Sequence, residues 1–198
     1  MIQIAIFCSG SGSNAEALMA HFHHHRSIQV AALVVNNPRS YAINRAEKFG
    51  VEGQYFSRNT FVESPDVILQ YLKDKNISFI LLAGFLQLIP EVLISNFPDR
   101  ILNIHPALLP SFGGPGMYGH FVHEAVKSAG VSETGLTIHL VDEEYDKGKI
   151  IFQATCRVEK DDSAADIAAR VLVMEHIHYP LVAEYVIQTT SKNDITFI

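Results

Sequence analysis

Two hydrogen-bonding side chains, Asn103 and His105, lie in the otherwise apolar segment Ile101–Pro110. If Ile101–His105 is a short buried strand, both side chains point to the same face, because residues two apart in a strand do so. Pro106 ends the strand and holds His105 extended at its carboxyl end, where open α/β sheets bind ligands. Histidine exchanges protons near neutral pH and asparagine donates to a developing oxyanion, so the pair indicates acyl-group chemistry.

The alternative interpretation is that both side chains are buried polar groups satisfied by the backbone. An acidic run downstream, formed by Asp142, Glu143, Glu144 and Asp146, favours the catalytic interpretation. A carboxylate from this run could orient the imidazole of His105 and raise its pKa.

Composition limits the class of protein and its partners. The chain has 198 residues and a formal net charge of −6, which fits one domain that buries a full core. Cys8 and Cys156 form no C-x-x-C pair and are expected to be reduced thiols. The chain has no dense run of lysine or arginine, so nucleic acid is not an expected partner. We expect small-molecule partners instead.

Nothing in the sequence predicts a membrane protein. The first residues lack the basic start and long apolar stretch of a signal peptide. The longest apolar run, Phe79–Leu86, is too short to cross a bilayer. We therefore expect no membrane partner and a cytoplasmic location.

Alternating strand and helix patterns run through the first half of the chain. Strands are expected over residues 3–8, 29–35, 54–56 and 78–83, and helices over 15–25, 41–49, 64–75 and from Pro90 onward. This order predicts an α/β fold with a doubly wound, mainly parallel sheet.

The second half is predicted to extend the sheet. Residues 111–119 form a glycine-rich loop before a helix over 121–128. Strands over 134–141 and 149–158 are expected to pair antiparallel, because their connection is too short for a crossover. Ser163 and Asp166 form a capping box for a long helix to about Gln188, which could break near Pro180. A frayed tail is expected after Thr189.

The glycine-rich segment Ser9–Asn14 joins the first strand to the first helix, which Ser13 or Asn14 is expected to cap. Free N–H groups and the positive end of a helix dipole suit a phosphate. The segment lacks the lysine of a Walker A motif.

The same segment matches the dinucleotide pattern G-x-G-x-x-A through Gly10, Gly12 and Ala15. That pattern expects an acidic residue about 20 positions later, where Asn36 and Asn37 stand instead. We therefore favour a phosphomonoester site made by Gly12, Ser13 and Asn14. A purely structural turn is the alternative.

Two further groups of side chains are of types that a ligand or a metal could use. Leu86, Gln87, Leu88 and Ile89 follow the fourth strand and could present an apolar wall to a flat heterocycle, whereas Phe85 is expected in the core. The cluster His21, His23, His24 and His25 is interpreted as exposed imidazoles near a helix end, because two histidines do not make a selective metal site.

With these residues in hand, the chain resembles the phosphoribosylglycinamide formyltransferase family over nearly its whole length. The matching motifs are Ser9–Asn14, Leu82–Phe85, Asn103–Pro110, His139 with Asp146–Gly148, and Glu175-His176 ahead of Tyr179-Pro180. The resemblance implies one Rossmann-like formyltransferase domain over residues 1–190, followed by a tail over 191–198. The enzyme would be a monomer or a homodimer.

The resemblance also implies an activity, transfer of the formyl group of 10-formyltetrahydrofolate to the amine of glycinamide ribonucleotide, without a metal. By analogy, Asn103 stabilises the oxyanion, His105 is the general acid and Asp146 raises the pKa of His105. Further contacts follow from the same analogy: the substrate phosphate on Gly12, Ser13 and Asn14, the folate on Leu86, Gln87, Leu88, Ile89 and Asn103, and the glycinamide portion on Glu175.

The sequence departs from the family pattern in three ways, one of which is that the loop over Ser111–His120 differs from the shorter form of many members. The arginine that helps bind the substrate phosphate is not securely placed, because either Arg58 or Ser64 could occupy its position. Tyr118 replaces a second histidine seen in some members. Rival interpretations are a formyltetrahydrofolate hydrolase, a sugar-nucleotide N-formyltransferase and a non-catalytic nucleotide-binding module.

Overall fold

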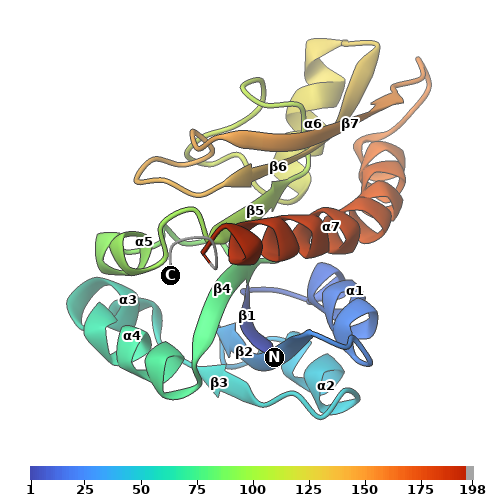
Figure 1. Ribbon diagram of the computed structural model, residues 1–198. Coiled ribbons are helices and arrows are strands. Elements are labelled where there is room, and N and C mark those ends of the chain that lie inside the picture. The colour runs from blue at the N-terminus through green and yellow to red at the C-terminus, as the bar shows by residue number, and fades with distance from the viewer. Residues whose placement is uncertain (195–198) are drawn as a thin grey trace.

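A seven-stranded sheet with the order β3-β2-β1-β4-β5-β6-β7 forms the centre of the computed structural model, which describes residues 1–194 (Figure 1). The parallel strands are β1 (Ile2–Cys8), β2 (Ile28–Val35), β3 (Gly53–Tyr55), β4 (Ile77–Leu82) and β5 (Ile101–His105). The strands β6 (Glu133–Leu140) and β7 (Ile150–Arg157) add antiparallel pairing at one edge. The predicted doubly wound, mainly parallel sheet is confirmed.

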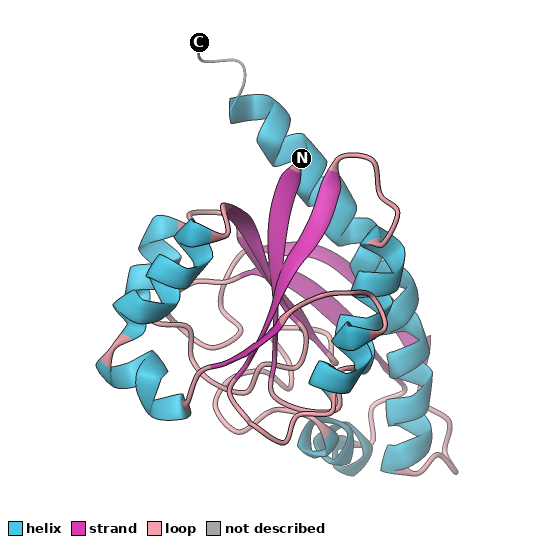
Figure 2. Cartoon of the chain, turned by 90° about the horizontal axis from the view of Figure 1, so that it is seen from below, coloured by secondary structure: helices cyan, strands magenta, loops and turns pink. Residues whose placement is uncertain are grey.

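Helices cover both faces of the sheet, as Figure 2 shows. One face carries α1 (Ser13–Phe22), α2 (Ala42–Glu47), α6 (His120–Ala129) and α7 (Ala164–Asp194). The other face carries α3 (Arg58–Glu63), α4 (Pro65–Asp74) and α5 (Glu91–Asn96). Because both faces of the central strands are buried, the apolar residues of these strands divide between two hydrophobic cores, one on each side of the sheet.

Several local predictions hold at residue level. The strand over Ile101–His105 has the predicted bounds, and β6 pairs with it antiparallel so that Asn103 faces His139. The capping box before α7 is present, because the Ser163 amide donates to Asp166 at 2.9 Å and the Asp166 amide donates to the Ser163 hydroxyl at 3.2 Å.

The start and end of α1 differ from the prediction. Neither Ser13 nor Asn14 caps the helix, because Gly12 takes the position before it in a left-handed conformation with no side-chain cap. The helix ends at Phe22, before the histidine cluster is complete. His21 and His25 are not simply exposed, since both contact the carboxylate of Glu184 in α7, at 2.7 and 3.3 Å.

The last helix is longer than predicted. It continues through Pro180 without a break and passes Gln188 to end at Asp194, so residues 191–194 of the expected tail are helical. The rest of that tail lies outside the described residues.

One short helix, α3, was not predicted. The Ser57 hydroxyl caps it by accepting from the Thr60 amide at 3.1 Å. Within residues 1–194 we find no helix with the length and apolarity that a membrane span requires.

Candidate active site

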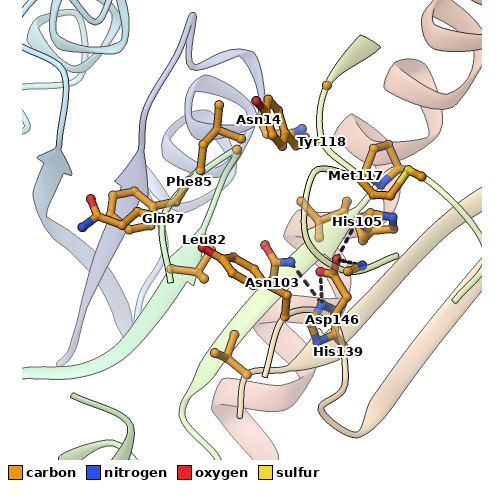
Figure 3. Close-up of a pocket in the computed structure, with 18 of the residues that line it drawn as sticks. Asn14, Leu82, Phe85, Gln87, Asn103, His105, Met117, Tyr118, His139 and Asp146 are labelled. Atoms are coloured by element: carbon orange, nitrogen blue, oxygen red, sulfur yellow. Dashed lines mark hydrogen bonds and ion pairs between the residues drawn. The ribbon is translucent and has the colours of Figure 1, made fainter. Parts of the chain in front are cut away.

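A cavity of about 570 Å³ opens at the carboxyl ends of β1, β4 and β5. The chain leaves β1 toward β2 on one side, while β4 lies on the other side, so this is the point where the strand order reverses. Loops diverge at such a point and leave room for a ligand. The cavity walls come from the loop after β1, the loop after β4, the end of β5 and two loops farther along the chain (Figure 3).

His105 lies at this cavity with its imidazole almost fully buried. Its Nε2 is 2.8 Å from the carbonyl oxygen of Phe112, so Nε2 carries a hydrogen and donates it there. Its Nδ1 faces the Oδ2 of Asp146 at 3.6 Å. The structure therefore brings together the predicted histidine and carboxylate, and it identifies Asp146 rather than Asp142 as the closer partner.

The pKa of His105 is lowered overall, although Asp146 raises it as expected. Burial is the largest influence and lowers the pKa of His105, because a charged imidazolium loses its hydration there. The carboxylate of Asp146 raises the pKa as expected, but it only partly offsets the effect of burial. The imidazole is therefore neutral at neutral pH, and Asp146 favours its protonated form.

Asp146 is held between two imidazoles. Its Oδ2 accepts from the Gly114 amide at 2.9 Å, and its Oδ1 lies 3.6 Å from Nε2 of His139. Burial acts to raise the pKa of Asp146, but the positive charge that His105 can carry and the hydrogen bond from the Gly114 amide hold it below its ordinary value. Asp146 is therefore a carboxylate at neutral pH.

His139 is a site residue that the sequence reasoning quoted as part of a motif but gave no role. Its Nδ1 donates to the Leu140 carbonyl at 2.8 Å, so its Nε2 can accept from the Asn103 amide nitrogen at 3.0 Å. This contact orients Asn103, as the dashed line in Figure 3 shows. Antiparallel pairing of β5 and β6 places His139 opposite Asn103, a register that spacing along the chain does not reveal.

The segment after β4 forms the apolar wall that was predicted. Leu86, Gln87, Leu88 and Ile89 all line the cavity. Leu86 and Leu88 remain 43% and 42% exposed and are thus available to a ligand, whereas Ile89 is buried. Gln87 is held in place, since it accepts from Asn36 at 3.1 Å and donates to the Arg58 carbonyl at 2.9 Å.

The glycine-rich loop lies at another part of the same cavity, where Ser13 and Asn14 are lining residues. Gly12 has a φ of 77°, and a Cβ there would lie 2.5 Å from the Cβ of Ala42, so this position requires glycine. The Asn14 amide nitrogen donates to Glu175 at 2.8 Å instead of pointing freely into the cavity.

Glu175 comes from α7 and also lines the cavity. Burial raises its pKa to about 7, and the hydrogen bond from Asn14 opposes this shift only in part. A carboxyl group with this pKa can exchange a proton near neutral pH.

The structure also places Arg58, Tyr118 and His123 relative to the cavity. Arg58 begins α3 and does not line the cavity; no arginine or lysine does so within the described residues. Tyr118, from the glycine-rich loop before α6, lines the cavity and is 44% exposed. His123 of α6 also lines the cavity. The sequence patterns did not indicate this buried side chain, because only the packing of α6 turns it inward.

The chain is similar to known proteins over most of its length. The formyl transferase family model matches residues 2–183. A phosphoribosylglycinamide formyltransferase of Bacillus subtilis is 31% identical over 198 residues, covering 98% of this chain and 99% of the relative. A chloroplastic one of Arabidopsis thaliana is 40% identical over 188 residues, covering 89% of this chain. This chain spans only about three fifths of the two plant relatives, 62% and 60% of their lengths.

Solved structures give the same result. The phosphoribosylglycinamide formyltransferase of Anaplasma phagocytophilum has a TM-score of 0.86 at 32% identity, covering 95% of this chain and 88% of that chain. The one of Brucella melitensis has a TM-score of 0.83 at 36% identity, covering 93% of this chain and 95% of that chain.

Proposed function

This chain belongs to the formyl transferase family, and from that premise we propose that it transfers the formyl group of 10-formyltetrahydrofolate to the amine of glycinamide ribonucleotide. Relatives named phosphoribosylglycinamide formyltransferase match it, and each match covers most of the relative and most of this chain. The observation that carries the proposal is the position of Asn103, His105 and Asp146 in one cavity that also includes the glycine-rich loop and the apolar wall.

The two parts of the cavity suit the two substrates. The loop at the start of α1 presents backbone amides and the positive end of a helix dipole to the ribonucleotide phosphate, through Gly12, Ser13 and Asn14. The segment Leu86–Ile89 packs against the flat pterin ring of the folate. Glu175 lies next to Asn14 and contacts the glycinamide portion.

The reaction starts when the amine nitrogen bonds to the formyl carbon and the carbonyl electron pair moves onto oxygen. One hydrogen of the Asn103 amide is used by His139, and the second stabilises the oxyanion. Neutral His105 takes the excess amine proton on Nδ1, the nitrogen that faces Asp146. The resulting imidazolium is stabilised by that carboxylate.

In the second half of the reaction, the tetrahedral intermediate collapses and the folate nitrogen leaves with the proton. The oxyanion re-forms the carbonyl, the bond between the carbon and the folate nitrogen breaks, and His105 gives its proton to that nitrogen. His105 thus serves first as a base and then as the general acid, which agrees with a pKa lowered by burial. Asp146 acts by stabilising the intermediate imidazolium and not by keeping the resting imidazole charged.

The test follows the absorbance of 10-formyltetrahydrofolate mixed with the protein, with and without glycinamide ribonucleotide. Deformylation that depends on the ribonucleotide would establish the transferase. Consumption without it would indicate a hydrolase. No consumption in either case would contradict the proposal, and sugar-nucleotide amines would then be tested as acceptors.

A further inference from the structure

The glycine-rich loop is held from outside the cavity by residues near α2 that no part of the proposed mechanism uses. The hydroxyl of Ser40 donates to the carbonyl of Gly10 at 2.7 Å. The guanidinium Nε of Arg45 donates to the carbonyl of Ser11 at 2.9 Å. Two consecutive carbonyls of the loop are therefore bound on the side of α2, which lies beside α1 (Figure 1).

These two bonds determine where the loop amides point. In a trans peptide the carbonyl of one residue and the N–H of the next point in opposite directions. Because the carbonyls of Gly10 and Ser11 point toward Ser40 and Arg45, the amides of Ser11 and Gly12 point away from α2. Neither amide donates to another residue in the described part of the chain.

Arg45 is itself fixed in place. It forms an ion pair with Glu16 in the first turn of α1, and Lys48 contacts the same carboxylate at 3.2 Å. Its guanidinium also lies over the ring of Tyr41, 5.2 Å from the ring centre. Arg45 does not line the cavity, so the side chain acts on the loop from behind.

We propose that Ser40 and Arg45 are positioning residues for phosphate binding, because they hold the carbonyls of Gly10 and Ser11 outward and so aim the amides of Ser11 and Gly12 at the phosphate. The inference rests on the proposed function, in that the phosphate is that of the ribonucleotide. In this role Arg45 contacts the loop and not the ligand.

Ser40→Ala is the sharpest test, because it removes one donor and no charge. The loop amides lose their alignment, so we expect KM for glycinamide ribonucleotide to rise about tenfold, as loss of one hydrogen bond implies. The kcat and the KM for 10-formyltetrahydrofolate should change less than about twofold. Ser40→Thr keeps the hydroxyl and should restore the ribonucleotide KM.

Arg45→Met should give the same pattern, and Lys48→Met is its matched control. Both variants remove one positive charge beside Glu16, but only Arg45 donates to the loop. An equal increase in ribonucleotide KM for Lys48→Met would overturn the proposal, since charge alone would then explain the effect. An unchanged ribonucleotide KM in Ser40→Ala would also overturn the proposal. A fall in kcat as large as the increase in KM would overturn it too.

A titration with inorganic phosphate separates this inference from the proposed function. Amide NMR shifts of Ser11 and Gly12 should saturate with phosphate in the natural protein and need about tenfold more phosphate in Ser40→Ala. If these shifts appear without any formyl transfer, the proposed function fails and the positioning role stands. If transfer occurs while Ser40→Ala binds phosphate normally, the positioning role fails.

Discussion

Burial shifts the pKa of two titratable side chains at the proposed active site, His105 and Glu175. It lowers the pKa of His105 and raises the pKa of Glu175, since both groups lose hydration of their charged forms. Asp146 keeps a lowered pKa because its neighbours offset its burial. At neutral pH the site therefore combines a neutral imidazole, a carboxylate and a carboxyl group that is partly protonated.

Replacing His105 with alanine removes the group that moves the proton. We expect kcat to fall by about 10²- to 10⁴-fold, the usual contribution of general acid–base catalysis, with an unchanged circular dichroism spectrum. His23→Ala, an exposed histidine after α1, is the control and should keep full activity. Near-normal turnover of the His105 variant would show that another group moves the proton.

Asp146→Asn tests the electrostatic coupling in the site. The carboxylate raises the pKa of His105 against the effect of burial, so its loss should lower that pKa further. An NMR titration of the His105 imidazole in both proteins measures the difference. An unchanged or higher pKa in the variant would contradict the coupling across 3.6 Å.

Glu175→Gln should change how stability depends on pH. A carboxyl whose folded pKa is raised from 4.5 to about 7 stabilises the fold fully below pH 4.5 and loses this contribution as the pH rises to about 7. Glutamine does not ionise, so its contribution does not fall with pH. The free energy of unfolding of the variant should therefore rise by up to about 3 kcal/mol relative to the natural protein across that range. Urea unfolding at several pH values measures it.

The exposed Glu124 of α6 provides the comparison for that series. Glu124→Gln makes the same substitution at a position that stays in water, so it controls for the loss of a carboxyl as such. If Glu175→Gln behaved in the same way, burial of that carboxyl would not be costly.

At the scale of elements, α7 connects the site to the sheet. The hydroxyl of Tyr179, on a fully buried ring, reaches the carbonyls of Leu82 at 3.0 Å and Leu102 at 3.1 Å. These residues belong to β4 and β5, the strands that precede the apolar wall and carry Asn103. Glu175 lies one turn earlier on the same helix, so the anchor at Tyr179 also fixes its position.

Tyr179→Phe should destabilise the protein by about 1–3 kcal/mol, because a buried carbonyl loses its donor. The free energy of unfolding in urea measures the effect. Tyr185→Phe removes a hydroxyl from a ring that is 67% exposed and should change stability by less than about 0.5 kcal/mol. Equal effects of the two variants would mean that the hydroxyl of Tyr179 does not anchor the helix.

The cavity exists because chain segments from the loop after β1 to α7 meet where the strand order reverses. The ribonucleotide and the folate would contact segments that are far apart in sequence, from Ser13 to Glu175. Binding should therefore stabilise the whole fold and not only one loop.

Saturating ligand should raise Tm in a predictable way. At a concentration about 100 times Kd, a ligand adds about 2.7 kcal/mol, which corresponds to about 5–10 °C for a domain of this size. A thermal melt with glycinamide ribonucleotide measures the shift, and ribose 5-phosphate, which lacks the glycinamide portion, serves as the control. An equal shift with both would show that the glycinamide portion is not recognised.

Local patterns by themselves determined much of this protein. The alternation of strands and helices, the strand Ile101–His105 and the capping box at Ser163 all depend on neighbours in sequence, and all were predicted. The loop Ser9–Asn14 was placed between strand and helix for the same reason. Asn103 and His105 could be paired because strand geometry alone puts them on one face.

How these pieces act together depends on contacts between segments that are distant in sequence. The contact of His139 with Asn103 requires the register of β5 with β6, and the support of Ser40 and Arg45 requires α2 to pack beside the loop. The direction of the His105 pKa depends on how deeply the folded chain buries the ring, which no local pattern contains. Burial and long-range contacts arise from packing between distant segments, so they cannot be deduced from spacing along the chain.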